Sequence, residues 1–106
     1  MFVVIRCMLG LTALPLLAAA SAVYADANLA RAKSCVSCHA MERKLVGPSY
    51  KAIAAKYAND ASAKDKLSVK VRQGGVGVWG QVPMPANPQL TVAEASTLVN
   101  WILEQK

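Results

Sequence analysis

The residues of this sequence most able to do chemistry are two cysteines and a histidine, in the order Cys35-Val36-Ser37-Cys38-His39. His39 is the only histidine in the chain. Two thiols three residues apart lie on one face of a helical turn, so both can reach neighbouring reactive groups along one edge of a flat molecule. An imidazole directly after the second thiol completes the attachment pattern of c-type haem. The sequence therefore predicts one haem c, bound by two thioethers from Cys35 and Cys38, with His39 as an axial ligand of the iron.

Three other uses of a Cys-x-x-Cys pair remain as alternatives. A structural zinc site takes four ligands, commonly from two such pairs, and the sequence holds no second pair. A thiol oxidoreductase of the thioredoxin kind places the pair between a strand and a helix, and no such strand pattern is visible. The two thiols could also be purely structural.

The second axial ligand must be a residue other than histidine. Beyond the apolar N-terminal segment the chain has two methionines, Met41 and Met84. Met41 is two residues after His39 and is confined to the same side of the haem plane. Met84 lies on a separate loop between Pro83 and Pro85, which predicts a ligand, with a flexible core filler as the alternative. His/Met ligation fills both axial positions of the iron and favours electron transfer over catalysis.

The N-terminal segment has the pattern of a secretory signal. One early positive charge is followed by an apolar run, and Val23 and Ala25 stand before an expected cleavage at Asp26. We expect residues 1–25 to be a cleaved signal peptide, residues 26–106 to be one domain, and the product to be periplasmic without stable membrane insertion. An uncleaved membrane anchor is the alternative, although a proline interrupts the apolar run.

The rest of the chain has helical hydrophobic periodicity and predicts an all-α, single-domain fold. A domain of this size buries little apolar surface by itself, and a covalent haem would complete its core. The connection 74–88 holds four glycines and three prolines, which predicts a structureless functional loop. Trp101 is predicted to be a core residue. Four short helices are expected: one capped by Asp26 or Asn28, one capped by Ser49, one from a Ser62–Asp65 capping box to Gly74, and one from a Thr91–Glu94 capping box.

The charge of the chain excludes one class of partner. Without the early Arg6, eleven basic residues stand against six acidic ones, a balance of about +5. The lysines are spread over separate helical turns, and no basic run is interleaved with aromatic residues, so a nucleic acid is not the expected partner. Most of these lysines are interpreted as a solvated surface; the alternative is steering towards an acidic protein.

The chain resembles bacterial class I cytochromes c of the c-551/c-552 (c8) group over nearly all of residues 26–106. This resemblance implies the class I fold, about four short helices around one haem, and a monomeric one-electron carrier in respiration that is not an enzyme. A haem enzyme or gas sensor with a displaceable sixth ligand is the rival interpretation. The similarity is carried by Cys35–His39, Leu45-Val46-Gly47-Pro48, Gly77-Val78-Trp79-Gly80, Pro83-Met84-Pro85 and Leu98-Val99-Asn100-Trp101.

The resemblance also implies roles for residues around the haem. The Pro48 carbonyl would accept a hydrogen bond from the far ring nitrogen of His39. Trp79 would donate its indole N–H to a haem propionate, with a core aromatic as the alternative. Asn87 matches a residue that contacts the methionine sulfur, with a turn residue as the alternative. Lys70 stands where relatives often carry an arginine.

Redox proteins are the partners that the resemblance implies. The donor would be a complex such as cytochrome bc1, and the acceptor a nitrite reductase, a terminal oxidase or a peroxidase. Electrons would pass through the haem edge near the thioethers. That edge is expected to be ringed by Val36, Leu45, Val82, Pro83 and Pro85.

Overall fold

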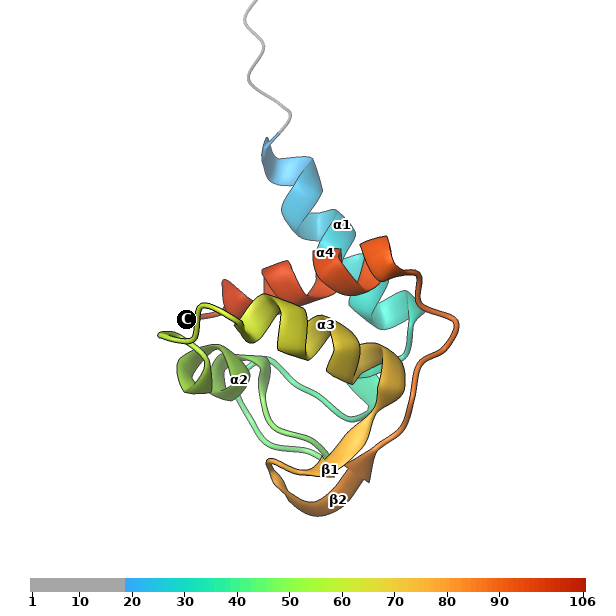
Figure 1. The fold of residues 1–106 in the computed structure, drawn as a ribbon. Helices are drawn as coiled ribbons and strands as arrows, with labels where there is room; N and C mark the ends of the chain where they lie inside the picture. The colour runs from blue at the N-terminus through green and yellow to red at the C-terminus, as the bar shows by residue number, and fades with distance from the viewer. Residues whose placement is uncertain (1–18) are drawn as a thin grey trace, which may run out of the picture.

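The computed structural model describes residues 19–106, and of residues 19–25 only the backbone, so most of the predicted signal peptide lies outside the described residues. Within this part of the chain, the prediction of four short helices is confirmed. A two-stranded hairpin and one 3-10 turn accompany them (Figure 1). In chain order the elements are α1 (Ala19–Ala32), η1 (Cys35–Ser37), α2 (Tyr50–Lys56), α3 (Ala63–Gln73), β1 (Gly75–Gly77), β2 (Gly80–Met84) and α4 (Val92–Leu103).

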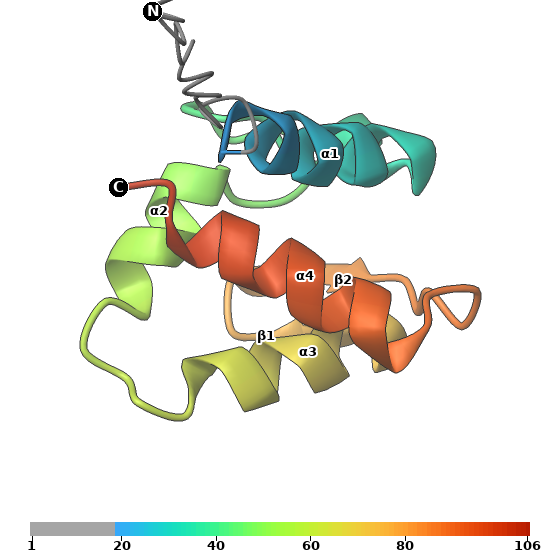
Figure 2. The same cartoon turned by 90° about the horizontal axis from the view of Figure 1, so that it is seen from above.

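Helix α4 is the element against which the other helices pack. Helices α1, α2 and α3 all contact it, and Figure 2 shows α1 and α3 on opposite sides of it. Two groups of buried side chains result. One contains Ala30, Tyr50, Leu90, Leu98 and Trp101, and the other contains Ile53, Leu67 and Val99. The predicted core position of Trp101 is confirmed.

Two of the predicted helix starts are confirmed. The Thr91 hydroxyl accepts a hydrogen bond from the Glu94 backbone N–H at 3.0 Å, and the Glu94 carboxylate accepts one from the Thr91 N–H at 3.1 Å. This reciprocal pair is a complete capping box. Helix α2 begins after Ser49, whose hydroxyl accepts from the Ala52 N–H at 3.0 Å. Local side-chain chemistry therefore sets both boundaries.

The third predicted start is also right, since α3 begins directly after Ser62 and ends directly before Gly74, but its predicted capping box is absent. The Ser62 hydroxyl and backbone N–H instead both donate to the Asp60 carboxylate, at 2.6 and 2.9 Å. The predicted cap of the first helix by Asp26 or Asn28 is wrong, because both residues lie within α1. The Asn28 side chain is engaged within the helix, where it accepts from Arg31 at 3.2 Å.

The connection between α3 and α4 is more ordered than predicted. Strands β1 and β2 pair antiparallel, with Gly75 opposite Met84 and Gly77 opposite Gly80. Both strands are almost wholly exposed, so their sequence lacks the alternation that marks a half-buried strand. The hairpin depends instead on glycines at positive φ, among them Gly74 at 71° and Gly80 at 110°. None of the helices that the structure describes is long and apolar enough to cross a membrane.

Candidate functional site

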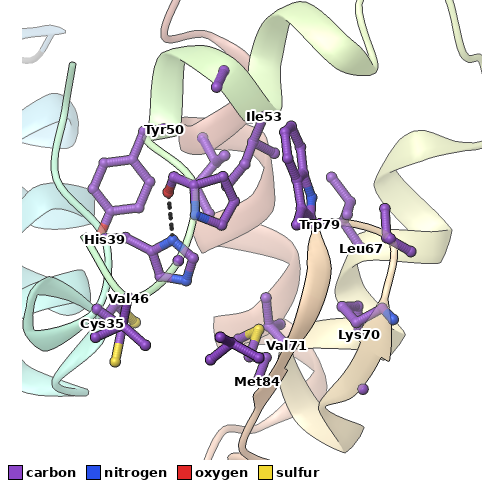
Figure 3. A pocket seen from close by; sticks show the side chains of 18 of the residues that line it. Cys35, His39, Val46, Tyr50, Ile53, Leu67, Lys70, Val71, Trp79 and Met84 are labelled. Carbon is purple, nitrogen blue, oxygen red and sulfur yellow. Dashed lines mark hydrogen bonds between the residues drawn. The ribbon is translucent and has the colours of Figure 1, made fainter. Parts of the chain in front are cut away.

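A largely apolar cavity of about 420 Å³ lies between the segment 35–50, helices α2 and α3, and the hairpin (Figure 3). It brings together residues that are far apart in the sequence. Of the seven predicted site residues, six line this cavity: Cys35, Cys38, His39, Pro48, Trp79 and Met84. Asn87 does not line it.

The two cysteines lie at one edge of the cavity, on and directly after the 3-10 turn. The backbone N–H groups of Cys38 and His39 both donate to the Cys35 carbonyl, at 3.1 and 3.0 Å, which holds the motif in a tight turn. Both thiols are free and half-buried. Burial raises the pKa of the Cys35 thiol, whereas thiol oxidoreductases depend on cysteines with a lowered pKa. The site is therefore poorly suited to thiol redox chemistry.

The orientation of the His39 ring is fixed from several directions. Its Nδ1 donates to the Pro48 carbonyl at 2.7 Å, so the expected hydrogen bond is present. The Tyr50 ring stacks on it with centroids 5.8 Å apart and planes inclined by 26°. Because Nδ1 is engaged in this way, Nε2 is the nitrogen left to bind a metal.

Gly47 is a residue of the site for which the sequence predicted no role of its own, only a place within the Leu45–Pro48 match. A Cβ at this position would lie 2.5 Å from Cε1 and 2.9 Å from Nδ1 of His39, closer than real side chains approach. The absence of a side chain therefore lets the backbone pack directly against the imidazole. The sequence did hold a sign of this role. Gly47 directly precedes Pro48, whose carbonyl was expected to accept a hydrogen bond from His39.

Met84 is the last residue of β2 and lies across the cavity from His39 (Figure 3). Its side chain is half-buried and lines the cavity, whereas Met41 is 38% exposed and does not line it. Gly74 supports this side of the site, since a Cβ there would overlap the Met84 carbonyl oxygen. The structure thus places an imidazole and a thioether on facing walls.

Trp79 and Lys70 both line the cavity. Trp79 lies in the hairpin turn beside Ile53 of α2 (Figure 3) and is 43% exposed. The ammonium group of Lys56 lies 5.3 Å from the centroid of the Trp79 ring. Lys70 extends along the hairpin, with its amine against Gly75.

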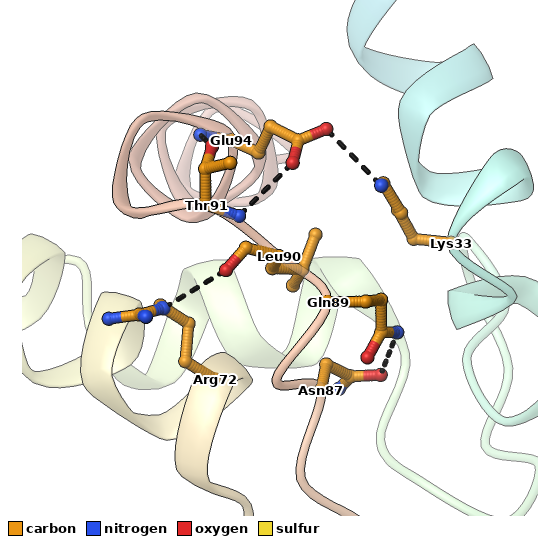
Figure 4. Close-up of polar contacts among 7 residues, drawn as sticks. All are labelled: Lys33, Arg72, Asn87, Gln89, Leu90, Thr91 and Glu94. Carbon is orange, nitrogen blue, oxygen red and sulfur yellow. Dashed lines mark hydrogen bonds and ion pairs between the residues drawn. The ribbon is translucent and has the colours of Figure 1, made fainter.

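Asn87 anchors the segment that follows the hairpin. Its side-chain amide donates to the Val71 carbonyl at 2.9 Å and to the Pro85 carbonyl at 3.4 Å. Its backbone N–H donates to the Arg72 carbonyl at 3.0 Å. Its side-chain oxygen, Oδ1, accepts a hydrogen bond from the side-chain amide of Gln89 at 3.3 Å (Figure 4). Asn87 therefore fixes the chain beyond Met84 to the end of α3.

The donors around the cavity suit an iron porphyrin better than a bare metal ion. Two thiols, one imidazole nitrogen and one thioether sulfur stand on apolar walls, which matches a flat apolar macrocycle bound from both faces. Across residues 19–106, no group of three or more His, Cys, Asp or Glu could hold a metal ion. The Tyr50 hydroxyl is buried without a described partner, and burial, with a smaller effect of Cys35, raises its pKa to about 12. It stays neutral, as an apolar cavity requires.

Comparison with known proteins gives the same assignment. The family model described as Cytochrome c matches residues 18–106. The chain is 51% identical to cytochrome c-551 of Allochromatium vinosum over 84 residues, which cover 79% of this chain and 89% of that protein. It is 46% identical to cytochrome c-552 of Nitrosomonas europaea over 98 residues, which cover 92% and 95% of the two proteins. The crystal structure of wild-type Nitrosomonas europaea cytochrome c552 superposes with a TM-score of 0.74 at 48% identity, covering 76% of this chain and 99% of that one.

The fold, the Cys35–His39 motif, the cavity and these similarities lead to one assignment. The class I fold and the covalent haem c predicted from the sequence are confirmed. The rival interpretation as an enzyme is set aside, since the family consists of electron carriers. The chain belongs to the cytochrome c family, close to the bacterial cytochromes c-551 and c-552, and is a monohaem electron carrier.

Proposed function

We propose that His39 and Met84 are the two axial ligands of the haem iron, and that Cys35 and Cys38 form its thioethers. The observation that carries this proposal is the facing arrangement of imidazole and thioether across one apolar cavity (Figure 3), whose lining includes both cysteines. When bound, the haem supplies one-electron exchange between ferrous and ferric iron. Two neutral axial ligands stabilise the ferrous state and leave the iron no free position.

The surrounding residues act by orienting these ligands. The Pro48 carbonyl accepts a hydrogen bond from His39 Nδ1, which fixes the tautomer and would leave Nε2, with raised basicity, to bind the iron. Asn87 holds the chain beyond Met84 through the Val71 carbonyl. Trp79 would donate its indole N–H to a propionate of the haem, and its place in the cavity lining supports this role.

We further propose that residues 1–25 are removed as a signal peptide and that residues 26–106 form the periplasmic domain. The pattern before this boundary supports it: an early positive charge, an apolar run, and Val23 and Ala25 before Asp26. The superposition with the solved relative covers 76% of this 106-residue chain, or about 81 residues. This equals the length of the segment 26–106. The mature protein would then be a monomer without stable membrane insertion.

The electron would leave through the haem edge near the thioethers. Val36, Leu45 and Val82 are 45%, 39% and 63% exposed, and Pro83 and Pro85 are exposed as well. An apolar ring of this kind favours a small, transient interface with another redox protein. Nearby basic residues would orient the encounter. A cytochrome bc1 complex as donor, and a nitrite reductase, terminal oxidase or peroxidase as acceptor, fit this role.

The test of the ligand assignment is the far-red absorption band of ferric iron bonded to a thioether sulfur. We expect this band in the wild-type holoprotein and in Met41→Leu, and its loss in Met84→Ala, which should also bind carbon monoxide when reduced. A band that survives in Met84→Ala would overturn the assignment. Retention of covalent haem after acid–acetone extraction tests the thioethers separately.

The exposed ring is tested by Val82→Asp. This change should slow electron exchange with a purified acceptor while leaving the far-red band intact. Val69→Asp is the matched control, because Val69 is similarly exposed, at 53%, but lies on α3 and does not line the cavity. Equal rates for the two variants would refute the role of the ring.

A further inference from the structure

The hairpin that carries Met84 has few ties to the helices. Its strands are exposed along nearly their whole length, and among the described elements that pack closely each strand packs only on the other. Trp79, in the turn between them, reaches the side of α2 next to Ile53 (Figure 3). The Trp79 ring is therefore a contact between the tip of the hairpin and the helical body.

Lys56 adds a second contact at the same point. It is the last residue of α2, and its ammonium group lies 5.3 Å from the centroid of the Trp79 ring. At this distance a cation is attracted by the negative face of an indole. Unlike Lys33, Lys51 and Lys66, Lys56 takes part in no ion pair among the described residues. Among the described residues, the Trp79 ring is therefore the group with which the Lys56 charge interacts.

We propose that Lys56 is a positioning residue for Trp79: its ammonium group holds the indole at the mouth of the haem cavity and ties the Met84 hairpin to α2. This inference rests on the proposed function, in which Trp79 donates to a haem carboxylate and Met84 binds the iron. A cation over the ring restrains the indole and also strengthens its N–H as a donor. Lys70 lines the same cavity, so removing Lys56 leaves that cation in place and changes mainly the charge over the Trp79 ring.

The experiment uses the reduced holoprotein and measures the solvent exchange rate of the Trp79 indole N–H by nuclear magnetic resonance. Lys56→Met removes the charge but keeps the side-chain length, and Lys56→Arg restores a cation that stacks on indole. Lys64→Met is the matched control, because Lys64 is exposed, unpaired among the described residues and remote from the cavity lining. We expect exchange to be about two- to fivefold faster in Lys56→Met and near the wild-type rate in the other two variants.

A second measurement follows the consequence for the hairpin. The rate at which added imidazole replaces the methionine ligand of ferric iron should rise in Lys56→Met and return towards wild type in Lys56→Arg. An unchanged indole exchange rate in Lys56→Met, or an equal increase in Lys64→Met, would overturn the inference. Absence of the far-red band in the wild-type protein would instead overturn the ligand assignment itself, so the two failures are distinguishable.

Discussion

The two walls of the haem cavity are built very differently. The histidine wall, residues 35–50, holds its ligand by a hydrogen bond to Pro48, by stacking on buried Tyr50 and by direct backbone contact at Gly47. The methionine wall, residues 74–87, is an exposed glycine-rich hairpin. It depends on a few contacts, chiefly those of Asn87 and Trp79.

This difference teaches which part of the site is fixed before the haem binds. Close packing lets the histidine wall define one ring orientation, and a change of even one methyl group there has no room to relax. The methionine wall can adjust, because its neighbours are exposed backbone and flexible side chains. We therefore expect the Fe–His bond to be the permanent one and the Fe–Met bond to be the one that mutations loosen.

Gly47→Ala is expected to have the largest effect, because the new Cβ would lie 2.5 Å from His39 Cε1 on the wall that cannot move. We expect a loss of about 3 kcal/mol in the free energy of unfolding of the holoprotein, measured by urea denaturation. Ser37→Ala, an exposed position on the same wall, is the control and should change little. A wild-type stability for Gly47→Ala would show that the histidine wall is as adaptable as the hairpin.

Gly74→Ala tests the methionine wall in the same way. Gly74 and Gly77 both have positive φ, 71° and 106°, but only at Gly74 would a Cβ overlap the Met84 carbonyl. We expect losses of about 2 kcal/mol for Gly74→Ala and about 1 kcal/mol for Gly77→Ala. The first variant should also weaken the far-red band. Equal losses would mean that backbone strain alone, without the overlap, accounts for the effect.

Asn87→Ala removes the bond from the segment after Met84 to the Val71 carbonyl. A lost hydrogen bond of a half-buried group costs about 1–2 kcal/mol, and imidazole should displace the methionine ligand faster. Gln89→Ala is the control, because it removes only a weaker contact to the same side chain, at 3.3 Å. If both variants exchange ligands at the wild-type rate, Asn87 does not restrain the methionine wall.

Part of the histidine wall could be predicted from the sequence, because the residues that form it are close together in the chain. The Cys35–His39 spacing lies within one short stretch and predicted the attachment motif. The family resemblance supplied the Pro48 acceptor, whereas the contact of Gly47 with His39 was not predicted. The hairpin was predicted as a structureless loop, since exposed strands carry no burial alternation. The contact of Lys56 with Trp79 joins distant segments, and no spacing rule contains it.

The helix caps also show that a short motif does not predict contacts with residues outside it. The Thr91–Glu94 capping box was predicted correctly because both partners lie within one helical turn. The Ser62–Asp65 motif predicted the start of α3 correctly, but its capping box does not form, and the Ser62 hydroxyl bonds instead to Asp60, upstream of the motif. A pattern therefore predicts well when no nearby group competes for the same hydrogen bond.

Thr91→Ala should lower the free energy of unfolding without changing the rate at which imidazole displaces the methionine ligand. The loss of the α4 cap should cost about 1 kcal/mol of unfolding free energy in the holoprotein. It should leave imidazole displacement of methionine unchanged, since Thr91 lies outside both walls and outside the cavity lining. Ser62→Ala, at a hydroxyl that caps no helix, should cost less. Faster ligand exchange in Thr91→Ala would mean that the walls are not independent of the helical scaffold.

The smallest effect is expected at Asp60, in the turn between α2 and α3. Hydrogen bonds from Ser62, and then from Lys66, lower the pKa of Asp60 from 3.8 to about 2. Because the folded-state pKa is lowered, this carboxylate stabilises the fold above pH 4, and the contribution is lost as the pH falls towards 2. Asp60→Asn should flatten the acid limb of the stability curve slightly and leave the haem spectrum unchanged. A steeper acid limb would contradict this sign.

The most direct test of the two-walled site is nuclear magnetic resonance of the ferrous holoprotein with carbon-13 in its methionine methyl groups. Beyond residue 25 the sequence has two methionines, Met41 and Met84. The ring current of the haem should shift one methyl signal far upfield, and that signal should vanish in Met84→Leu but persist in Met41→Leu. Two unshifted methyl signals, or a shifted signal that disappears in Met41→Leu, would contradict the account.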